Sequence, residues 1–150
     1  MEAPDSERGW IVTHISVIYP WQMDHMGHMN VQFYASLFDQ ATWSFFSEYG
    51  ITGDYLRNNE RGMAALIQHT EYKQELFAGS VVEIRSKLNS ATPKTINFTH
   101  RMYLRPDHIL VATTEFTGVH MDRSSRKSIP FPDDIFQRMK SNLPESTERD

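Results

Sequence analysis

The sequence predicts one α+β domain, in which a curled antiparallel sheet of five or six strands surrounds a single long helix. Two features indicate this fold: residues 31–49 have helical periodicity and many aromatic side chains, and strand-like segments with turns between them follow residue 63. A sheet can bury one helix by curling around it. A chain of 150 residues is long enough for one domain with its own core, so we expect residues 1–150 to form it, with flexible ends at 1–9 and 143–150.

Composition excludes several classes of protein. The chain is 39% hydrophobic and 23% charged, which is typical of a globular domain. The net charge of −4 and the absence of any Lys/Arg block argue against nucleic-acid binding. There is no cysteine, so disulfides and thiolate metal sites are excluded. No apolar run is long enough to span a bilayer and no signal-like segment is visible, so we expect a cytoplasmic protein that does not bind membranes.

The first strand and the loop after it come from the N-terminal part of the chain. Residues 11–19 are apolar and β-branched, and Pro20 ends the predicted strand. A polar loop occupies residues 21–29. Asn30 is a candidate N-cap for the helix, because its side-chain oxygen can accept a hydrogen bond from an N–H two or three residues later.

Residues 31–49 predict the central helix, which Gly50 can end in the left-handed conformation. At 100° per residue, its apolar side chains cover about half of the circumference, which is wider than the apolar stripe of a surface helix. We therefore expect the helix to be enclosed, with Phe38, Ala41 and Phe45 buried.

Four further strands are expected in the second half of the chain, at residues 64–72, 81–88, 95–105 and 109–119. Apolar and polar side chains alternate along them: Val82, Ile84 and Leu88 share one face of their strand. Residues 51–62 show no clear period and are expected to connect helix and sheet. Residues 133–142 predict a short helix with acidic residues at its start.

The best candidate site lies between the first strand and the helix, at Asp24-His25-Met26-Gly27-His28-Met29-Asn30. A helix N-terminus leaves backbone N–H groups unpaired and carries partial positive charge. Asp24 is the only carboxylate of this loop, and it could act as a general base on water or as a nucleophile. The first helical N–H groups, near Val31, could polarise a carbonyl. No Gly-x-Ser-x-Gly nucleophile elbow occurs.

This arrangement resembles the 4-hydroxybenzoyl-CoA thioesterase-like branch of the hotdog-fold acyl-CoA thioesterases. The matching residues are Asp24, Gly27, His28, Asn30, Tyr34 and Gly50. The order of elements matches over roughly residues 11–119. The sequence departs from the family at three positions: Gln22, Val31 and Asp39 stand where an acid, an asparagine and a glutamate are common.

The resemblance implies hydrolysis of an acyl-CoA thioester to a free acid and CoA, without metal or cofactor. It implies that Asp24 is catalytic and that the backbone N–H at about Val31 stabilises the oxyanion. His28 and Asn30 are then expected to hold the loop or the acyl group. The resemblance also implies a homodimer or homotetramer in which two sheets join edge to edge and each active site lies between subunits.

Aromatic side chains near the loop suggest a compact acyl group. Trp21, Tyr34 and Trp43 offer π faces, which attract cations by roughly 0.5–2 kcal/mol each when desolvated. Asp39 lies one turn before Trp43 and could add a negative charge. We therefore expect a short acyl group, aromatic or quaternary-ammonium as in a betaine-type acyl-CoA, in preference to palmitoyl-CoA. The alternative is that these rings only fill the core.

Other functions remain open. The soft side chains of the loop suit Cu(I), so a metal-binding module is one alternative: Met23, His25, Met26, His28 and Met29. A second alternative keeps the fold, as a dehydratase that uses a histidine for proton transfer or as an acyl-CoA binder without turnover. Basic strand residues form either a solvated face or contacts to CoA phosphates: Arg85, Lys87, Arg101 and Arg105.

Overall fold

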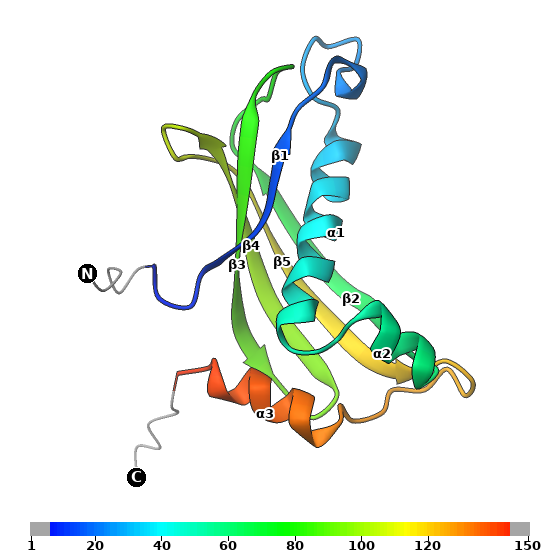
Figure 1. The fold of residues 1–150 in the computed structure, drawn as a ribbon. Coiled ribbons are helices and arrows are strands. Elements are labelled where there is room, and N and C mark those ends of the chain that lie inside the picture. Colours follow the sequence, from blue (N-terminus) through cyan, green and yellow to red (C-terminus); the bar gives the residue numbers. More distant parts are fainter. Residues whose placement is uncertain (1–6, 145–150) are drawn as a thin grey trace.

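The chain forms a five-stranded antiparallel sheet curled around one long helix (Figure 1). The computed structural model describes residues 7–144, so residues 1–6 and 145–150 of the two predicted flexible ends lie outside it. The elements in order are β1 (Ile11–Val17), the short 3-10 helix η2 (Pro20–Gln22), α1 (Val31–Glu48), α2 (Gly53–Asn58), β2 (Arg61–Tyr72), β3 (Val81–Ala91), β4 (Thr95–Arg105), β5 (Ile109–Asp122) and α3 (Asp133–Ser141). The strand order is β1-β3-β4-β5-β2. The predicted α+β fold is confirmed, with five strands.

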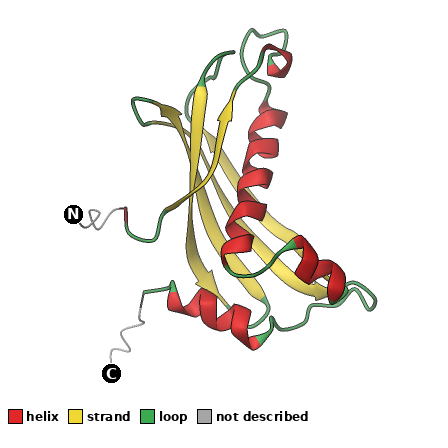
Figure 2. Cartoon of the chain, in the orientation of Figure 1, coloured by secondary structure: helices red, strands yellow, loops and turns green. Residues whose placement is uncertain are grey.

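The helices lie on one side of the sheet. Figure 2 shows α1 running along one face, while the opposite face carries no helix within the described residues. β1 and β2 are the two edge strands, and every pairing between neighbouring strands is antiparallel. In the part of the chain that the structure describes, no helix is both long and apolar enough to cross a bilayer.

α1 is enclosed as its periodicity predicts. Phe38 and Ala41 are fully buried and Phe45 is 1% exposed, because they share the stripe of the helix that faces the sheet. The Asn30 side chain caps the helix by accepting from the Gln32 N–H at 3.0 Å. The chain leaves the helix through Gly50, whose φ of +86° is a conformation that favours glycine. These three features confirm the predicted helix and its ends.

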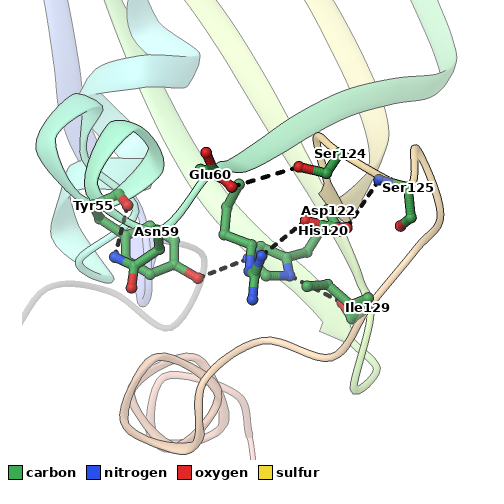
Figure 3. A network of polar contacts seen from close by, with 9 residues as sticks. Tyr55, Asn59, Glu60, His120, Asp122, Ser124, Ser125 and Ile129 are labelled. Carbon is green, nitrogen blue, oxygen red and sulfur yellow. Dashed lines mark hydrogen bonds and ion pairs between the residues drawn. The ribbon is translucent and has the colours of Figure 1, made fainter.

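The segment 51–62, expected to be a connector, contains α2 and the start of β2. Thr52 caps α2 by accepting from the Tyr55 N–H at 3.1 Å. Figure 3 shows what holds this short helix in place: Tyr55 contacts the buried His120 on β5. His120 Nδ1 donates to the Ile129 carbonyl at 2.9 Å, so its Nε2 accepts from the Tyr55 hydroxyl at 2.8 Å. Such pairings between distant residues leave no periodic signal in the sequence.

A second buried histidine joins α1 to the middle of the sheet. His100 on β4 is fully buried, and its Nε2 lies 2.8 Å from the Thr42 hydroxyl of α1. Since Thr42 donates its one proton to the Phe38 carbonyl at 2.9 Å, His100 Nε2–H must be the donor to Thr42. His100 Nδ1 then accepts from the Ser86 hydroxyl, which in turn contacts Thr13 at 2.7 Å. Burial lowers the pKa of His100 to about 3.

His100 is neutral in the folded chain but titrates near 6.5 in the unfolded chain. Protons therefore bind preferentially to the unfolded chain below pH 6.5, and the folded state becomes less stable as the pH falls. We expect this one residue to lower the free energy of unfolding by about 2 kcal/mol between pH 7.5 and pH 5. Urea unfolding at both pH values measures it, and His100→Gln should show a smaller pH dependence. An equal pH dependence in variant and wild type, or titration of the His100 ring by NMR across this range, would contradict the account.

Candidate active site

The loop between β1 and α1 is a closed turn. The Gly27 N–H donates to the Asp24 carbonyl at 3.0 Å, and the Asp24 N–H donates to the His28 carbonyl at 3.1 Å. Gly27 has a φ of +85°, which explains why glycine occupies this position of the motif. The Met29 N–H donates to the carbonyl of Leu76 at 2.8 Å, which ties the loop to the segment after β2. The turn therefore presents Asp24 in one fixed orientation.

Asp24 is a partly exposed residue, and its carboxylate accepts two hydrogen bonds. Its Oδ2 accepts from the Asn30 side-chain amide at 2.8 Å, and its Oδ1 accepts from the Met26 N–H at 2.8 Å. These bonds favour the ionised form, so the amide of Asn30 first, and then the Met26 N–H, lower the pKa of Asp24 below its ordinary value of 3.8. His28 and His25 add a smaller electrostatic effect in the same direction. Asp24 is therefore an anion at neutral pH.

Asn30 links the carboxylate to the helix. Its amide nitrogen donates to Asp24 while its oxygen caps α1, so one side chain fixes both groups. The next residue, Val31, begins the helix, and within the described residues its N–H has no hydrogen-bond partner. A carboxylate and a free backbone donor are thus held beside each other by the same amide.

Asp24 and Val31 both line a hollow of about 370 Å³. One wall is the loop with the start of α1, and the other is Tyr72 and the residues that follow β2, up to Glu75. Tyr34 bridges the walls: its hydroxyl donates to the Gln74 carbonyl at 3.0 Å, and its ring meets Tyr72 edge-on with 5.2 Å between centroids. Burial, and secondly the charge of Glu75, raise the pKa of Tyr34, so it stays a neutral donor. His28 Nε2 lies 3.6 Å from the Glu75 carboxylate.

Five of the eight predicted residues meet in this hollow: Asp24, His28, Asn30, Val31 and Tyr34. The remaining three lie elsewhere in the single chain. Trp21 is 69% exposed and contacts Phe33 edge-on at 5.3 Å. Asp39 and Trp43 line a separate hollow of about 100 Å³, further along α1.

The second wall of the first hollow was not predicted. The predicted strand ends at Tyr72 and gives Gln74 no role, and nothing local marks their contact with α1, because Tyr34 and Gln74 are 40 positions apart. The signal that exists is weak: a polar segment, residues 68–75, that follows the apolar stretch of β2 and contains Tyr72 as its one aromatic residue.

The His and Met side chains of the loop do not come together as a metal site. Met29 is buried in the core at 1% exposure, whereas Met26 is 68% exposed. Within residues 7–144, no three His, Cys, Asp or Glu side chains come close enough to hold a metal ion. The structure thus offers no support for the copper-binding alternative.

Known proteins share this sequence pattern and this fold. The model of the thioesterase-like superfamily matches residues 18–139. Betainyl-CoA thioesterase of Pseudomonas aeruginosa is 23% identical over 131 residues, which are 87% of this chain and 82% of that protein. L-carnitine dehydrogenase/betainyl-CoA thioesterase of Rhizobium meliloti is 24% identical over 118 residues, which are 79% of this chain but 24% of that longer protein.

A solved structure of a Staphylococcus aureus protein in complex with CoA has a TM-score of 0.82 and 21% identity, and the match covers 93% of this chain and 90% of that one. This likeness shows the fold, and the family model, which spans most of the chain, shows the family. Together they confirm the resemblance seen in the sequence and the prediction of a thioesterase. The chain therefore belongs to the thioesterase-like superfamily and is a hotdog-fold member of it.

Proposed function

We propose that this protein hydrolyses an acyl-CoA thioester to a free acid and CoA, with Asp24 as its reacting carboxylate. The observation that carries the proposal is the pairing of an ionised, oriented Asp24 with the free Val31 N–H at the start of α1. Thioester hydrolysis needs an oxygen nucleophile and a donor for the developing oxyanion. The relatives named as CoA thioesterases support the same reaction class.

The reaction can follow two routes from this geometry. Asp24 either attacks the acyl carbon to give an anhydride that water then cleaves, or takes a proton from a water that attacks directly. In both routes the carbonyl oxygen accepts from the Val31 N–H, the C–S bond breaks, and CoA leaves as a thiolate that takes up a proton. The lowered pKa of Asp24 keeps it ionised but makes it a weak proton acceptor.

Hotdog proteins with other activities remain the alternative. A dehydratase would depend on His28 for proton transfer, and a binding protein would show no turnover. His28 is partly buried between the Met29 carbonyl and Glu75, which suits a residue that shapes the hollow. We therefore assign His28 to substrate positioning.

The proposed assembly is a homodimer, or a tetramer of such dimers, joined through β2. The free edge of β2 is 12 residues long, and its middle, residues 65–69, is exposed. Leu66 and Ile67 there are 59% and 64% exposed. A long apolar edge of this kind favours pairing with another strand. Antiparallel pairing of two β2 strands about their middle brings Arg61 of one subunit towards the Tyr72 end of the other, so each Asp24 hollow lies at the interface.

The acyl group is proposed to be compact. The second hollow, beside Asp39 and Trp43, has a volume of about 100 Å³, which a long saturated chain would exceed. Both curated relatives carry betainyl-CoA in their names, and betainyl is a short cationic acyl group. These facts support a short acyl-CoA, cationic or aromatic, as the substrate of this chain.

The role of Asp24 is tested by Asp24→Asn. The amide keeps the size and hydrogen bonding of the side chain but can neither accept a proton nor form a stable anhydride. We expect kcat for the best acyl-CoA, read by free thiol release, to fall at least about 100-fold. His28→Ala should cost less, within about 10-fold. Unchanged urea unfolding of Asp24→Asn is the control, and a near-normal kcat would refute the assignment.

The hydrogen bond from Asn30 should set the pKa of Asp24. Asn30→Ser keeps an N-capping hydroxyl but is too short to carry the amide donor to Asp24, so the pKa of Asp24 should rise towards 3.8. Carboxyl-carbon NMR titration of wild type and variant measures the shift. Equal titration midpoints would show that Asn30 does not hold the carboxylate in solution.

Assembly through β2 is tested by Ile67→Lys. Ile67 lies near the proposed two-fold axis, where each introduced lysine meets its own copy, and like charges at such a contact cost several kcal/mol. We expect monomers at micromolar concentration, by light scattering, together with loss of hydrolysis. Ile15→Lys is the matched control, since Ile15 is 50% exposed on the opposite edge strand. A dimeric and active Ile67→Lys would rule out this interface.

A further inference from the structure

The hollow beside Asp39 is walled by aromatic rings. Trp43 and Phe46 reach it from α1, Phe98 from β4 and Phe116 from β5. The rings form a continuous chain: Trp43 meets Phe46 edge-on at 5.7 Å, Phe46 meets Phe98 edge-on at 5.4 Å, and Phe98 stacks on Phe116 at 5.4 Å. The hollow thus offers ring surfaces from three elements of the fold.

Asp39 is the one charged residue among the described residues that line this hollow. It lies one helical turn before Trp43, and both residues are exposed to solvent in the single chain. The only other polar side chain there, Thr42, is engaged with the Phe38 carbonyl and with His100. A primary ammonium group would need several hydrogen-bond acceptors. A quaternary ammonium group needs none and is attracted by ring faces and by a nearby carboxylate.

We propose that this hollow binds the quaternary ammonium head of the acyl group. We call it the ring-lined site, formed by Asp39, Trp43, Phe46, Phe98 and Phe116. Its volume of about 100 Å³ accommodates a group of roughly four non-hydrogen atoms, such as trimethylammonium. The inference rests on the proposed acyl-CoA hydrolysis and adds to it the group that determines the preferred substrate.

The ring-lined site of one subunit binds the head of an acyl group whose thioester lies at Asp24 of the partner subunit. Within one chain, Trp43 lies roughly 20 Å further along the helix axis than Asn30, which is beyond the reach of a compact acyl group bound at Asp24. β2 pairing changes this relation, because the site is lined by Met63, Ala64 and Ala65 at the start of β2, and antiparallel pairing turns that end towards the Tyr72 end of the partner. Each complete site would combine Asp24 of one subunit with the partner's Asp39.

The arginines near the ring-lined site are not placed to repel a cationic head group from it. Three arginines line an adjoining hollow of about 440 Å³ that shares Trp43 and Met63 with the ring-lined site: Arg57, Arg61 and Arg123. Two of the three are ion-paired with aspartates, so their charge is partly compensated. None of the three lines the ring-lined site itself.

A pair of isosteric substrates isolates the charge. Betainyl-CoA and 3,3-dimethylbutanoyl-CoA differ only in a quaternary nitrogen that replaces a quaternary carbon. The ammonium group also makes the betainyl carbonyl more electrophilic, so the ratio of the two uncatalysed hydrolysis rates is the reference. We expect wild-type kcat/KM to favour betainyl-CoA by at least about 10-fold beyond that reference ratio, since ring faces and a carboxylate attract the charged group only. A kcat/KM ratio no larger than the ratio of the uncatalysed rates would overturn the ring-lined site and leave the proposed thioesterase function standing. Hydrolysis of neither ester, nor of other acyl-CoAs, would instead overturn the proposed function.

Two variants locate the effect. Asp39→Asn and Trp43→Leu should each reduce the betainyl to dimethylbutanoyl ratio by about 5- to 10-fold. Glu48→Gln, which neutralises another exposed carboxylate of α1 outside this site, is the matched control and should keep the wild-type ratio. Equal ratios in wild type, Asp39→Asn and Trp43→Leu would place the selectivity elsewhere and overturn the inference.

Mixed dimers test the contribution of the partner. A dimer of one Asp24→Asn subunit and one Asp39→Asn subunit, purified through two different tags, contains one intact Asp24 and one intact Asp39 on different chains. If the site is shared between subunits, both belong to one complete site and the dimer shows the wild-type ratio. If each site belongs to one chain, the only active Asp24 lacks its carboxylate partner and the dimer shows the lower ratio of Asp39→Asn, which would contradict the shared site.

Discussion

One amide side chain holds the proposed active site of this domain together. Asn30 donates to the Asp24 carboxylate and at the same time caps α1, so the loop and the helix N-terminus are fixed relative to each other. The helix is rigid because its inner stripe is buried against the curled sheet. The turn that closes at Gly27 is thereby anchored to the packed core. The position of the carboxylate and the orientation of the first free N–H both follow from that connection.

α1 also links the two hollows of the molecule. Its first turn borders the Asp24 hollow, and its middle turns supply Asp39, Trp43 and Phe46 to the ring-lined site. In a single chain the two are too far apart for one small acyl group. The proposed pairing through the exposed edge of β2 would bring them together across a two-fold axis, and it would explain both the apolar edge and the separation of the two hollows.

Local patterns predicted most of the fold. The periodicity of residues 31–49, the cap at Asn30 and the glycine at 50 define α1, and alternation along the second half of the chain defines the sheet. The loop residues of the site followed from the same local reading. What the sequence did not predict depends on contacts between distant positions: the wall at Tyr72 to Glu75, the bonds of His100, and the docking of Tyr55 on His120. Trp21, which the sequence grouped with Tyr34 and Trp43, is 69% exposed and packs against Phe33, so in the single chain it lines neither the Asp24 hollow nor the ring-lined site.

The central claim is that the acyl carbon reacts between Asp24 and the start of α1. The most direct measurement is a crystal structure with a ketone analogue of the substrate, in which a methylene replaces the thioester sulfur. The account predicts that the ketone oxygen lies within hydrogen-bond distance of the Val31 N–H, about 3 Å, with the Asp24 carboxylate in contact with the ketone carbon. A ketone bound away from Asp24, or with its oxygen on another donor, would contradict the account.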